Sequence, residues 1–400
     1  MGVLEFNFNL LKEAAQIAEN TEIKDPIKFS LKNPLKLSSD LLRLVVIHAH
    51  FRAKINKKVK EWANVKTLIA PPKLSLEQCS SSFSANYKKT LVNGSSALDL
   101  TGGLGVDSYF LSQNFKDFTY NELNPLLFEI AKFNFQQLKV NNVSFSNLDA
   151  EIFLKTTNKR FDLIYFDPAR RDLENKKLFK IEDCQPNLLE LKEWLFEITS
   201  TILIKLSPLL DLKLAIKTVK NIHNIIILSE KNEIKEILLI LKPFENYDPI
   251  IKCINETSLG QIQNFDFRFS EEENCKIRYS LPSQYLYEAN ASLNKAGAFK
   301  VLAEKFKLQK IAPNSHLYSS DTINYEFPGR IFKIIDQVNY DKKKLEAVLP
   351  TLKANISCRN FPYKPEEIKK KMGLKEGGEY YLFFSENHLK QKIVLICSKI

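Results

Sequence analysis

Glycine and acidic residues between positions 99 and 107 form the part of this sequence best suited to hold a small molecule. A short apolar run ends in an acidic residue, and a glycine-rich segment and a second acidic residue follow it. Glycine permits unusual backbone φ values and lets the backbone approach a nucleotide closely. We therefore expect the turn of a strand–turn–helix unit to bind a ligand. The positions concerned are Asp99, Thr101, Gly102, Gly103, Gly105 and Asp107.

Three further acidic residues stand at the ends of the predicted second, third and fourth strands. They are Glu122, Asp149 and Asp167. A carboxylate in the position of Glu122 can accept hydrogen bonds from both hydroxyls of a ribose, and one in the position of Asp149 can accept the exocyclic amine of an adenine. Sheets of α/β proteins bind ligands at the carboxyl edge of their strands, so we expect these carboxylates to share one site.

Asp167 begins a segment that could hold the reacting group of a substrate. The Asp167 carboxylate and the Pro168 carbonyl can both accept hydrogen bonds from an exocyclic amine and so align its nitrogen lone pair. Arg170 can stack on a base or clamp a phosphate. An Asp-Pro pair is also a common turn at the end of a strand. Its place after the fourth strand, downstream of the other acids, favours the catalytic interpretation.

These residues resemble the motifs of class I S-adenosylmethionine-dependent methyltransferases. The stretch from Asp99 to Asp107 resembles their first motif. Glu122, followed by Leu123, resembles their ribose-binding acid, and Asp149, followed by Ala150, resembles the acid beside the adenine. The resemblance implies that S-adenosylmethionine is the cofactor and that these positions hold it.

Asp167 and Pro168 resemble the start of the D-P-P-x motif of enzymes that methylate amino groups of bases. Those enzymes continue with a second proline and an aromatic residue that stacks on a flipped base. Here the two positions are Ala169 and Arg170. The resemblance therefore implies a methyl acceptor held by Asp167 and Pro168, but it does not fix which atom of a base that acceptor is.

The resemblance covers nearly the whole chain and extends to bacterial proteins in which ferredoxin-like and THUMP-like modules follow the methyltransferase domain. It implies methylation of a nucleic acid, with RNA, either tRNA or rRNA, as the expected partner. The stretches that carry it are Pro72–Ser81, Tyr285–Asn290, Lys295–Phe299, Phe327–Arg330 and Arg359–Pro362.

The pattern of apolar residues predicts an α/β protein. We expect a Rossmann-like doubly wound methyltransferase sheet, an N-terminal helical segment and two small C-terminal α+β modules. The expected domains are 1–85 (helical), 86–272 (methyltransferase), 273–322 (ferredoxin-like) and 323–400 (THUMP-like). Later elements are predicted as strands at 200–206, 223–228, 250–255 and 265–269, and as helices at 125–138, 186–198, 211–220, 230–241 and 291–306.

The positive charge of the chain lies in its flanks. Residues 1–85 carry 13 basic and 8 acidic side chains and residues 246–400 carry 24 and 18, whereas residues 86–245 carry 21 of each. Basic flanks around a neutral catalytic domain favour a polyanionic partner such as RNA. A lysine-rich genome is the alternative explanation, although it would also make the middle basic. The lysines between Arg52 and Lys60 could lie along a phosphate backbone or simply be solvated.

The six cysteines are scattered without C-x-x-C spacing, so we expect no structural metal and a reducing, cytoplasmic environment. No signal peptide or membrane span is expected. His48 and His50 are two residues apart and would lie on different faces of a helix, which disfavours a metal pair. Cys358 faintly resembles the nucleophile of pyrimidine C5 methyltransferases, but a buried thiol is the favoured interpretation.

Two other functions are compatible with parts of the sequence. Gly103, Gly105 and Ser108 nearly satisfy a dinucleotide fingerprint, which would suit an NAD-dependent oxidoreductase. However, no Ser/Tyr-Lys or His catalytic set follows the fourth strand. The second alternative is an RNA-binding or assembly protein without turnover, against which the intact glycine and acidic positions argue.

Overall fold

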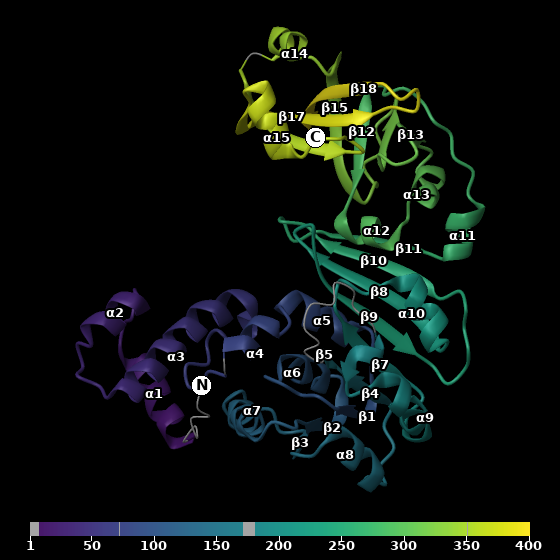
Figure 1. The fold of residues 1–400 in the computed structure, drawn as a ribbon. Helices are drawn as coiled ribbons and strands as arrows, with labels where there is room; N and C mark the ends of the chain where they lie inside the picture. Colours follow the sequence, from purple (N-terminus) through teal and green to yellow (C-terminus); the bar gives the residue numbers. More distant parts are fainter. Residues whose placement is uncertain (1–7, 72, 171–180, 350) are drawn as a thin grey trace. The chain divides into compact units, whose positions relative to one another are not determined.

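The computed structural model describes residues 8–71, 73–170, 181–349 and 351–400. Within these ranges, the side chains of Lys73, Leu74 and Arg170 are not described. Figure 1 shows the helices and strands. The chain divides into two compact units. The first comprises Met1–His223 and Glu236–Tyr247, and the second Asn224–Lys235 and Asp248–Ile400. The predicted site residue Arg170 therefore has only its backbone inside the described part.

A largely parallel sheet forms the centre of the first unit, in the strand order β9-β7-β4-β1-β2-β3. All neighbouring pairs are parallel except β9 with β7. The sheet and the helices around it confirm the predicted Rossmann-like α/β class. The strands are β1 (Gly94–Asp99), β2 (Phe115–Asn121), β3 (Val143–Ser146), β4 (Leu163–Phe166), β7 (Ile202–Leu206) and β9 (Glu233–Leu241).

The helices that connect these strands begin at side chains able to cap them. Asn124, Asp149, Asn187 and Asp211 each accept hydrogen bonds from backbone N–H groups in the first turn of the helix that follows. The helices of this part are α5 (Ser82–Thr90), α6 (Val106–Ser112), α7 (Pro125–Gln137), α8 (Ala150–Thr156), α9 (Leu188–Ile198) and α10 (Leu212–Val219). Short β5 (Ala169–Arg170) and β6 (Cys184–Gln185) pair antiparallel.

The N-terminal helices belong to the same compact unit as the sheet. Phe51 and Trp62 pack in one buried cluster with Phe110 of α6, and Leu44 packs in another with Ile130 of α7. Ser38 caps α3, and its side chain accepts the N–H of Leu41. The helices are α1 (Phe8–Asn20), α2 (Pro26–Lys32), α3 (Ser39–Lys58), η1 (Lys60–Trp62) and α4 (Lys73–Gln78).

The helix predicted over 230–241 is wrong, because this segment forms strand β9. Its sequence has apolar residues at both helical and alternating spacings, but it is rich in isoleucine and leucine that are buried in the sheet. Lys231 and Asn232 both have positive φ, which makes a tight two-residue turn immediately before it. The local turn and the antiparallel pairing with β7 outweigh the helical periodicity.

In the second unit, β10 (Ile250–Glu256) pairs parallel with β8 (Ile222–Glu230) and antiparallel with β11 (Ile262–Phe267). A seven-stranded sheet follows, in the order β13-β14-β12-β15-β18-β17-β16. The two predicted α+β modules therefore share one sheet, joined where β12 pairs with β15. Its strands are β12 (Tyr285–Ala289), β13 (Gln309–Lys310), β14 (Leu317–Ser320), β15 (Gly329–Asn339), β16 (Lys353–Arg359), β17 (Lys375–Glu386) and β18 (Lys392–Lys399).

One expectation for the helices of this unit needs correction. The single helix predicted over 291–306 is divided into α12 (Ala291–Ala296) and α13 (Lys300–Lys305), because Gly297 takes a φ of +75° and ends α12. Helix α11 (Phe269–Asn274) precedes them, and its Glu272 accepts hydrogen bonds from the first N–H groups of α13 at 2.9 Å. Helices α14 (Lys342–Val348) and α15 (Pro365–Met372) follow.

Within the described ranges, no helix combines the length and apolar character needed to cross a membrane. The same residues contain no group of three or more His, Cys, Asp or Glu side chains placed to hold a metal ion.

His48 joins α3 to the segment that precedes α4. Its Nδ1–H donates to the Leu44 carbonyl at 2.9 Å, and its Nε2 accepts the N–H of Ala70 at 3.0 Å. Both ring nitrogens are occupied in a way that requires the neutral imidazole. Burial lowers the pKa of His48 to about 4.

We predict that this side chain makes the stability of the first unit depend on pH. Between pH about 4 and the unfolded value of 6.5 the unfolded chain binds a proton that the folded chain excludes. The free energy of unfolding should therefore rise with pH across this window, by on the order of 3 kcal/mol from His48, and then level off. Urea unfolding of wild type and of His48→Gln, which does not titrate, measures the difference.

The exposed neighbour provides the control, since His50→Gln should keep the wild-type rise. An identical pH dependence in wild type and His48→Gln would contradict the role given to His48.

Candidate active site

A cavity of about 500 Å³ opens at the carboxyl ends of β1, β2, β4 and β7. Eleven of the thirteen residues predicted for the site line it, so the structure brings the separate motifs together. Pro168 is buried between two lining residues, and the side chain of Arg170 lies outside the described part. The eleven are Asp99, Thr101, Gly102, Gly103, Gly105, Asp107, Glu122, Leu123, Asp149, Ala150 and Asp167.

The glycine loop is shaped by close packing against two aromatic rings. A Cβ added to Gly102 would lie 2.0 Å from the ring of Tyr120, and one added to Gly105 would lie 2.5 Å from that of Phe135. Gly105 also has a φ of +85°. The Tyr120 hydroxyl donates to the Gly103 carbonyl at 2.6 Å. No other residue type would let the loop follow this path.

Asp99 holds the loop from inside. Its side chain is buried and accepts hydrogen bonds from the Thr101 N–H, at 3.1 Å, and from the Ser108 hydroxyl. Burial raises the pKa of Asp99 to about 7, although these hydrogen bonds oppose the shift. These contacts hold the glycine loop in its orientation.

Glu122 lies at the rim of the cavity and faces the loop. Its two carboxylate oxygens accept the N–H groups of Gly103 and Asn124, each at 2.8 Å. Asp149 caps α8 and accepts the N–H of Glu151 at 2.8 Å. The buried Asn121 side chain joins the carboxyl ends of β1 and β3, because it hydrogen-bonds backbone groups that follow both strands. Sequence analysis did not single out Asn121.

Asp167 is fixed by two contacts at the end of β4. Its N–H donates to the Thr101 hydroxyl at 2.7 Å, and its carboxylate forms an ion pair with Lys205. Lys205 lies at the end of β7 and lines the same cavity. Burial alone would lower the pKa of Lys205, but the neighbouring carboxylates, Asp167 first among them, raise it above its usual value. Lys205 is therefore a permanent ammonium beside Asp167.

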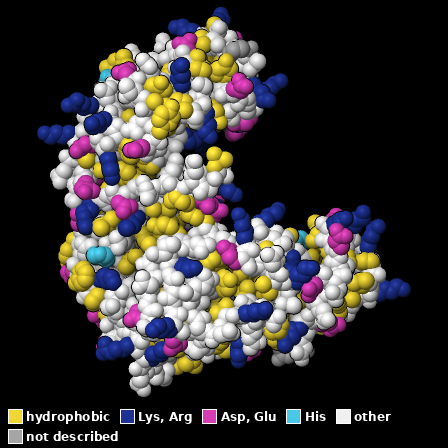
Figure 2. Space-filling model, turned by 180° about the vertical axis from the view of Figure 1, so that it is seen from behind, with side chains coloured by type: hydrophobic (Ala, Val, Ile, Leu, Met, Phe, Trp, Pro, Cys, Tyr) yellow, Lys and Arg dark blue, Asp and Glu magenta, His cyan; other side chains and the backbone are white. Residues whose placement is uncertain are grey.

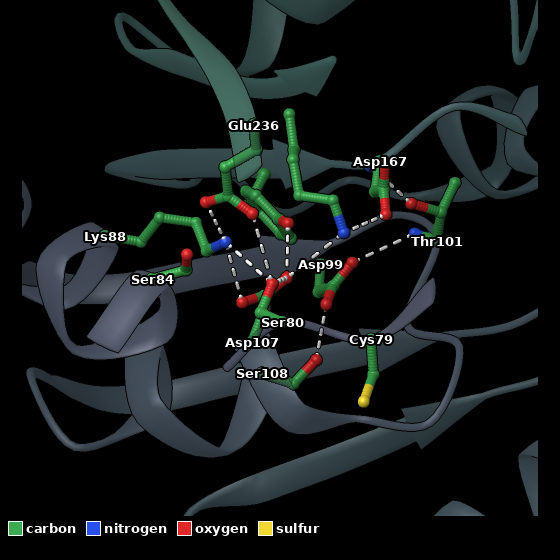
Figure 3. Close-up of polar contacts among 12 residues, drawn as sticks. Cys79, Ser80, Ser84, Lys88, Asp99, Thr101, Asp107, Ser108, Asp167 and Glu236 are labelled. Carbon is green, nitrogen blue, oxygen red and sulfur yellow. Dashed lines mark hydrogen bonds and ion pairs between the residues drawn. The ribbon is translucent and has the colours of Figure 1, made fainter. Parts of the chain in front are cut away.

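A charge cluster, which we define as Lys88, Asp107, Glu236, Lys205 and Asp167, supports the cavity. Figure 3 labels four of its members, Lys88, Asp107, Asp167 and Glu236. Lys88 of α5 is fully buried and lies 3.0 Å from Asp107 and 2.6 Å from Glu236. Lys205 lies 3.8 Å from Asp107. Burial alone would raise the pKa of Asp107, but Lys88 and Lys205 outweigh it and hold that pKa below the usual value.

The cavity includes residues that the sequence did not assign to it. Ser75, Gln78 and Cys79 reach it from α4 and the turn that follows, a stretch noted only for its family resemblance. Lys205 was also missed, although a single lysine near the end of an apolar strand is a detectable signal. Glu190 lines the wall formed by α9.

Cys358 lies in the second unit rather than at this cavity. Burial raises its pKa to about 11 despite the opposing effect of Arg359. A thiol that holds its proton so firmly is a poor nucleophile at neutral pH.

The cavity is strongly acidic. Among its described lining residues, Lys205 alone is basic and seven are acidic. Charges in such a site favour a cationic ligand and disfavour an anionic one. The acidic lining residues are Asp99, Asp107, Glu122, Asp149, Glu151, Asp167 and Glu190.

Two family profiles match the second unit. The ferredoxin-like domain family matches residues 285–328, and the THUMP domain-like family matches residues 329–399. The chain is also similar to a solved structure from Porphyromonas gingivalis W83 that is classed as a methyltransferase. The two are 30% identical, the match covers 98% of this chain and 99% of the other, and the TM-score is 0.89.

Shorter similarities involve RNA methyltransferases. An uncharacterized RNA methyltransferase of Mycoplasma mobile is 39% identical over 77 residues, which cover 19% of this chain and 21% of that protein. The ribosomal RNA small subunit methyltransferase J of Coxiella burnetii is 34% identical over 91 residues, which cover 21% of this chain and 36% of that protein. The chain thus spans only about a fifth to a third of these two relatives.

The similarity over the full length, the two domain matches and the site at the edge of the parallel sheet lead to one family. The chain belongs to the class I methyltransferases that carry ferredoxin-like and THUMP-like domains.

Proposed function

We propose that this protein is an S-adenosylmethionine-dependent RNA methyltransferase that acts on an exocyclic amino group of a base. The observation that carries the proposal is the acidic cavity, with Asp167 held at its edge between Thr101 and Lys205. A methyltransferase needs alignment more than acid–base chemistry, and a polar group fixed at the end of a central strand can provide that alignment.

The residues around the cavity fit S-adenosylmethionine. When bound, its sulfonium supplies an activated methyl group. Glu122 would accept the ribose hydroxyls and Asp149 the adenine amine. A Cβ built on Gly103 meets no atom closer than 3.9 Å, so a side chain there would enter the space available to a ligand. Because S-adenosylmethionine carries a sulfonium and an ammonium, the acidic lining would stabilise it.

The same charges argue against an NAD-dependent oxidoreductase. A dinucleotide would bring a diphosphate to a cavity whose described lining contains seven carboxylates and one ammonium. Ser108, the third position of the near-fingerprint, is buried and donates its hydroxyl to Asp99. Its side chain is therefore committed to the loop.

The Asp167–Lys205 ion pair could hydrogen-bond the edge of a base that carries an exocyclic amine beside a ring nitrogen. The second oxygen of Asp167 and the Pro168 carbonyl would accept the N–H groups of an amine, while a free N–H of Lys205 would donate to the adjacent ring nitrogen. Adenine, cytosine and guanine each have an amine next to a ring nitrogen acceptor, whereas uracil has none. We therefore propose an amino-bearing base as the acceptor.

RNA as the substrate is supported by the charge of the flanks and by the names of the two partial relatives. On the face drawn in Figure 2, lysine and arginine side chains stand out over the N-terminal helices and the C-terminal part, with acidic side chains between them. Two lysines of the basic run on α3 bind groups of the protein itself. Lys54 pairs with Glu77 at 3.1 Å, and Lys58 donates to the carbonyls of Leu76 and Glu77.

We predict that Glu122→Ala weakens S-adenosylmethionine binding at least tenfold. The variant loses a charged acceptor for two hydroxyls, and hydrogen bonds to charged groups contribute about 1.5–3 kcal/mol each. Isothermal titration calorimetry measures the affinity. Glu129→Ala, on the exposed face of α7, is the matched control and should bind as wild type does. Unchanged affinity in Glu122→Ala would remove Glu122 from the cofactor site.

We predict that Asp167→Ala keeps cofactor affinity within about threefold but lowers methyl transfer by at least about 100-fold. Losing a contact made to the acceptor in the transition state lowers turnover without weakening cofactor binding. The acceptor is RNA from a strain that lacks this gene, and mass spectrometry of its nucleosides reads the product. We expect a base methylated on its exocyclic amine. Normal transfer by Asp167→Ala, or a ribose-methylated product, would contradict the assignment.

We predict that Lys205→Met lowers methyl transfer at least about tenfold, because the Asp167 carboxylate loses the ion pair that holds it in place. Lys205→Arg can keep this ion pair and should retain most of the activity. Single-turnover methyl transfer measures the difference. Wild-type transfer by Lys205→Met would contradict a positioning role for Lys205.

A further inference from the structure

Three of the stretches that carry the family resemblance are far apart in the sequence but meet at one carboxylate in the second unit. They contribute Glu288 on β12, Arg330 on β15 and Arg359 at the end of β16. Arg330 donates to Oε2 of Glu288 through Nε, at 2.8 Å, and through Nη2. Arg359 donates to Oε1 through Nε and Nη2, at 3.1 and 2.9 Å. We call these three residues the arginine pair and its carboxylate.

The carboxylate is buried, while the guanidinium groups reach the surface. The side chain of Glu288 is 3% exposed, and those of Arg330 and Arg359 are 40% and 44% exposed. Each arginine turns its Nε–Nη2 edge inward. Its Nη1 has no hydrogen-bond partner among the residues that the structure describes. The remaining N–H groups of the two partly exposed guanidinium groups are thus not used by Glu288.

The charges of the group do not cancel. One arginine would neutralise Glu288, and the second leaves a net charge of +1 at the surface. This excess positive charge favours an anionic ligand.

This geometry fits a phosphodiester. The planar guanidinium binds phosphate oxygens through two parallel N–H groups, and Arg suits this contact better than Lys. Because Glu288 already fixes both side chains, little rotamer freedom remains to be lost on binding. Phosphate contacts position a nucleic acid without reading its sequence.

We propose that Arg330 and Arg359, oriented by Glu288, bind the phosphate backbone of the RNA substrate. The proposal rests on the RNA part of the proposed function and adds a defined docking point in the second unit. It assigns Glu288 the role of a positioning residue, since its carboxylate faces the arginines and not the solvent.

Total bacterial RNA, labelled and titrated by filter binding at several salt concentrations, tests the proposal. We expect Arg330→Gln and Arg359→Gln each to weaken binding roughly tenfold and to lower the salt slope by about one. Arg330→Lys and Arg359→Lys keep the positive charge but lose the paired N–H groups of the guanidinium. These variants should therefore retain the wild-type salt slope but bind RNA more weakly than wild type does. Lys333→Gln removes an exposed charge from the opposite face of β15 and should change affinity less than twofold.

Calorimetry with S-adenosylmethionine on the same proteins separates this proposal from the proposed function. Variants that lose RNA but bind the cofactor as wild type does support the arginine pair. Wild-type protein that binds RNA but no cofactor would contradict the proposed methyltransferase function. It would leave the role of the arginine pair in RNA binding uncontradicted. If the glutamine variants bind RNA like wild type, or lose no more than Lys333→Gln, the arginine pair is not a docking point. The lysine variants keep this test valid should a glutamine variant fail to fold.

Discussion

The edge of the sheet that lines the cavity depends on one buried cation, Lys88. Its ammonium is inaccessible to solvent, and an isolated charge in that position would cost several kcal/mol. Asp107 at the start of α6 and Glu236 on β9 must therefore close on it, and the Ser80 hydroxyl lies 2.9 Å away. Three segments distant in sequence are thereby held in register, with the glycine loop between β1 and α6 among them.

Asp107 transmits this constraint to the ends of β4 and β7 at the cavity. The Tyr165 hydroxyl of β4 donates to it at 2.7 Å, and Lys205 of β7 approaches it from the other side. The charge cluster contains three carboxylates and two ammonium groups, so it carries one net negative charge at the cavity. A cationic ligand would balance that charge, whereas an anionic ligand would add to it. The same arrangement that stabilises the fold would therefore also favour a cationic ligand.

The sequence predicted the site better than it predicted the elements that support it. Asp99, Glu122, Asp149 and Asp167 could be found because strand, turn and acid recur at regular spacings along the chain. Their meeting at one cavity followed from parallel strands having their carboxyl ends at one edge. Contacts made across the sheet leave no such local pattern. Lys88 looks like an ordinary surface lysine of a helix, and only the fold shows that it is buried.

The error over 230–241 has the same origin. Its residues satisfy two periodicities, and the choice between helix and strand is made by pairing with β7 and by a turn at Lys231 and Asn232 with positive φ. Glu236, which completes the charge cluster, lies in this segment. With a helix predicted there, the ion pair between Glu236 and Lys88 could not be anticipated. The wrong element and the missed ion pair therefore have the same cause.

Asp107 and Glu288 show how one motif can serve two purposes. Each is a buried carboxylate between two cations, but around Asp107 the cations are nearly inaccessible, whereas around Glu288 they are about 40% exposed. The inaccessible ammonium of Lys88 makes its hydrogen bonds within the protein and fixes the path of the chain. Exposed guanidinium groups have more N–H donors than one carboxylate can accept, and the remainder face the solvent. The exposure of the partners, and not the identity of the carboxylate, decides whether such a group only stabilises the fold or also offers a surface for an anion.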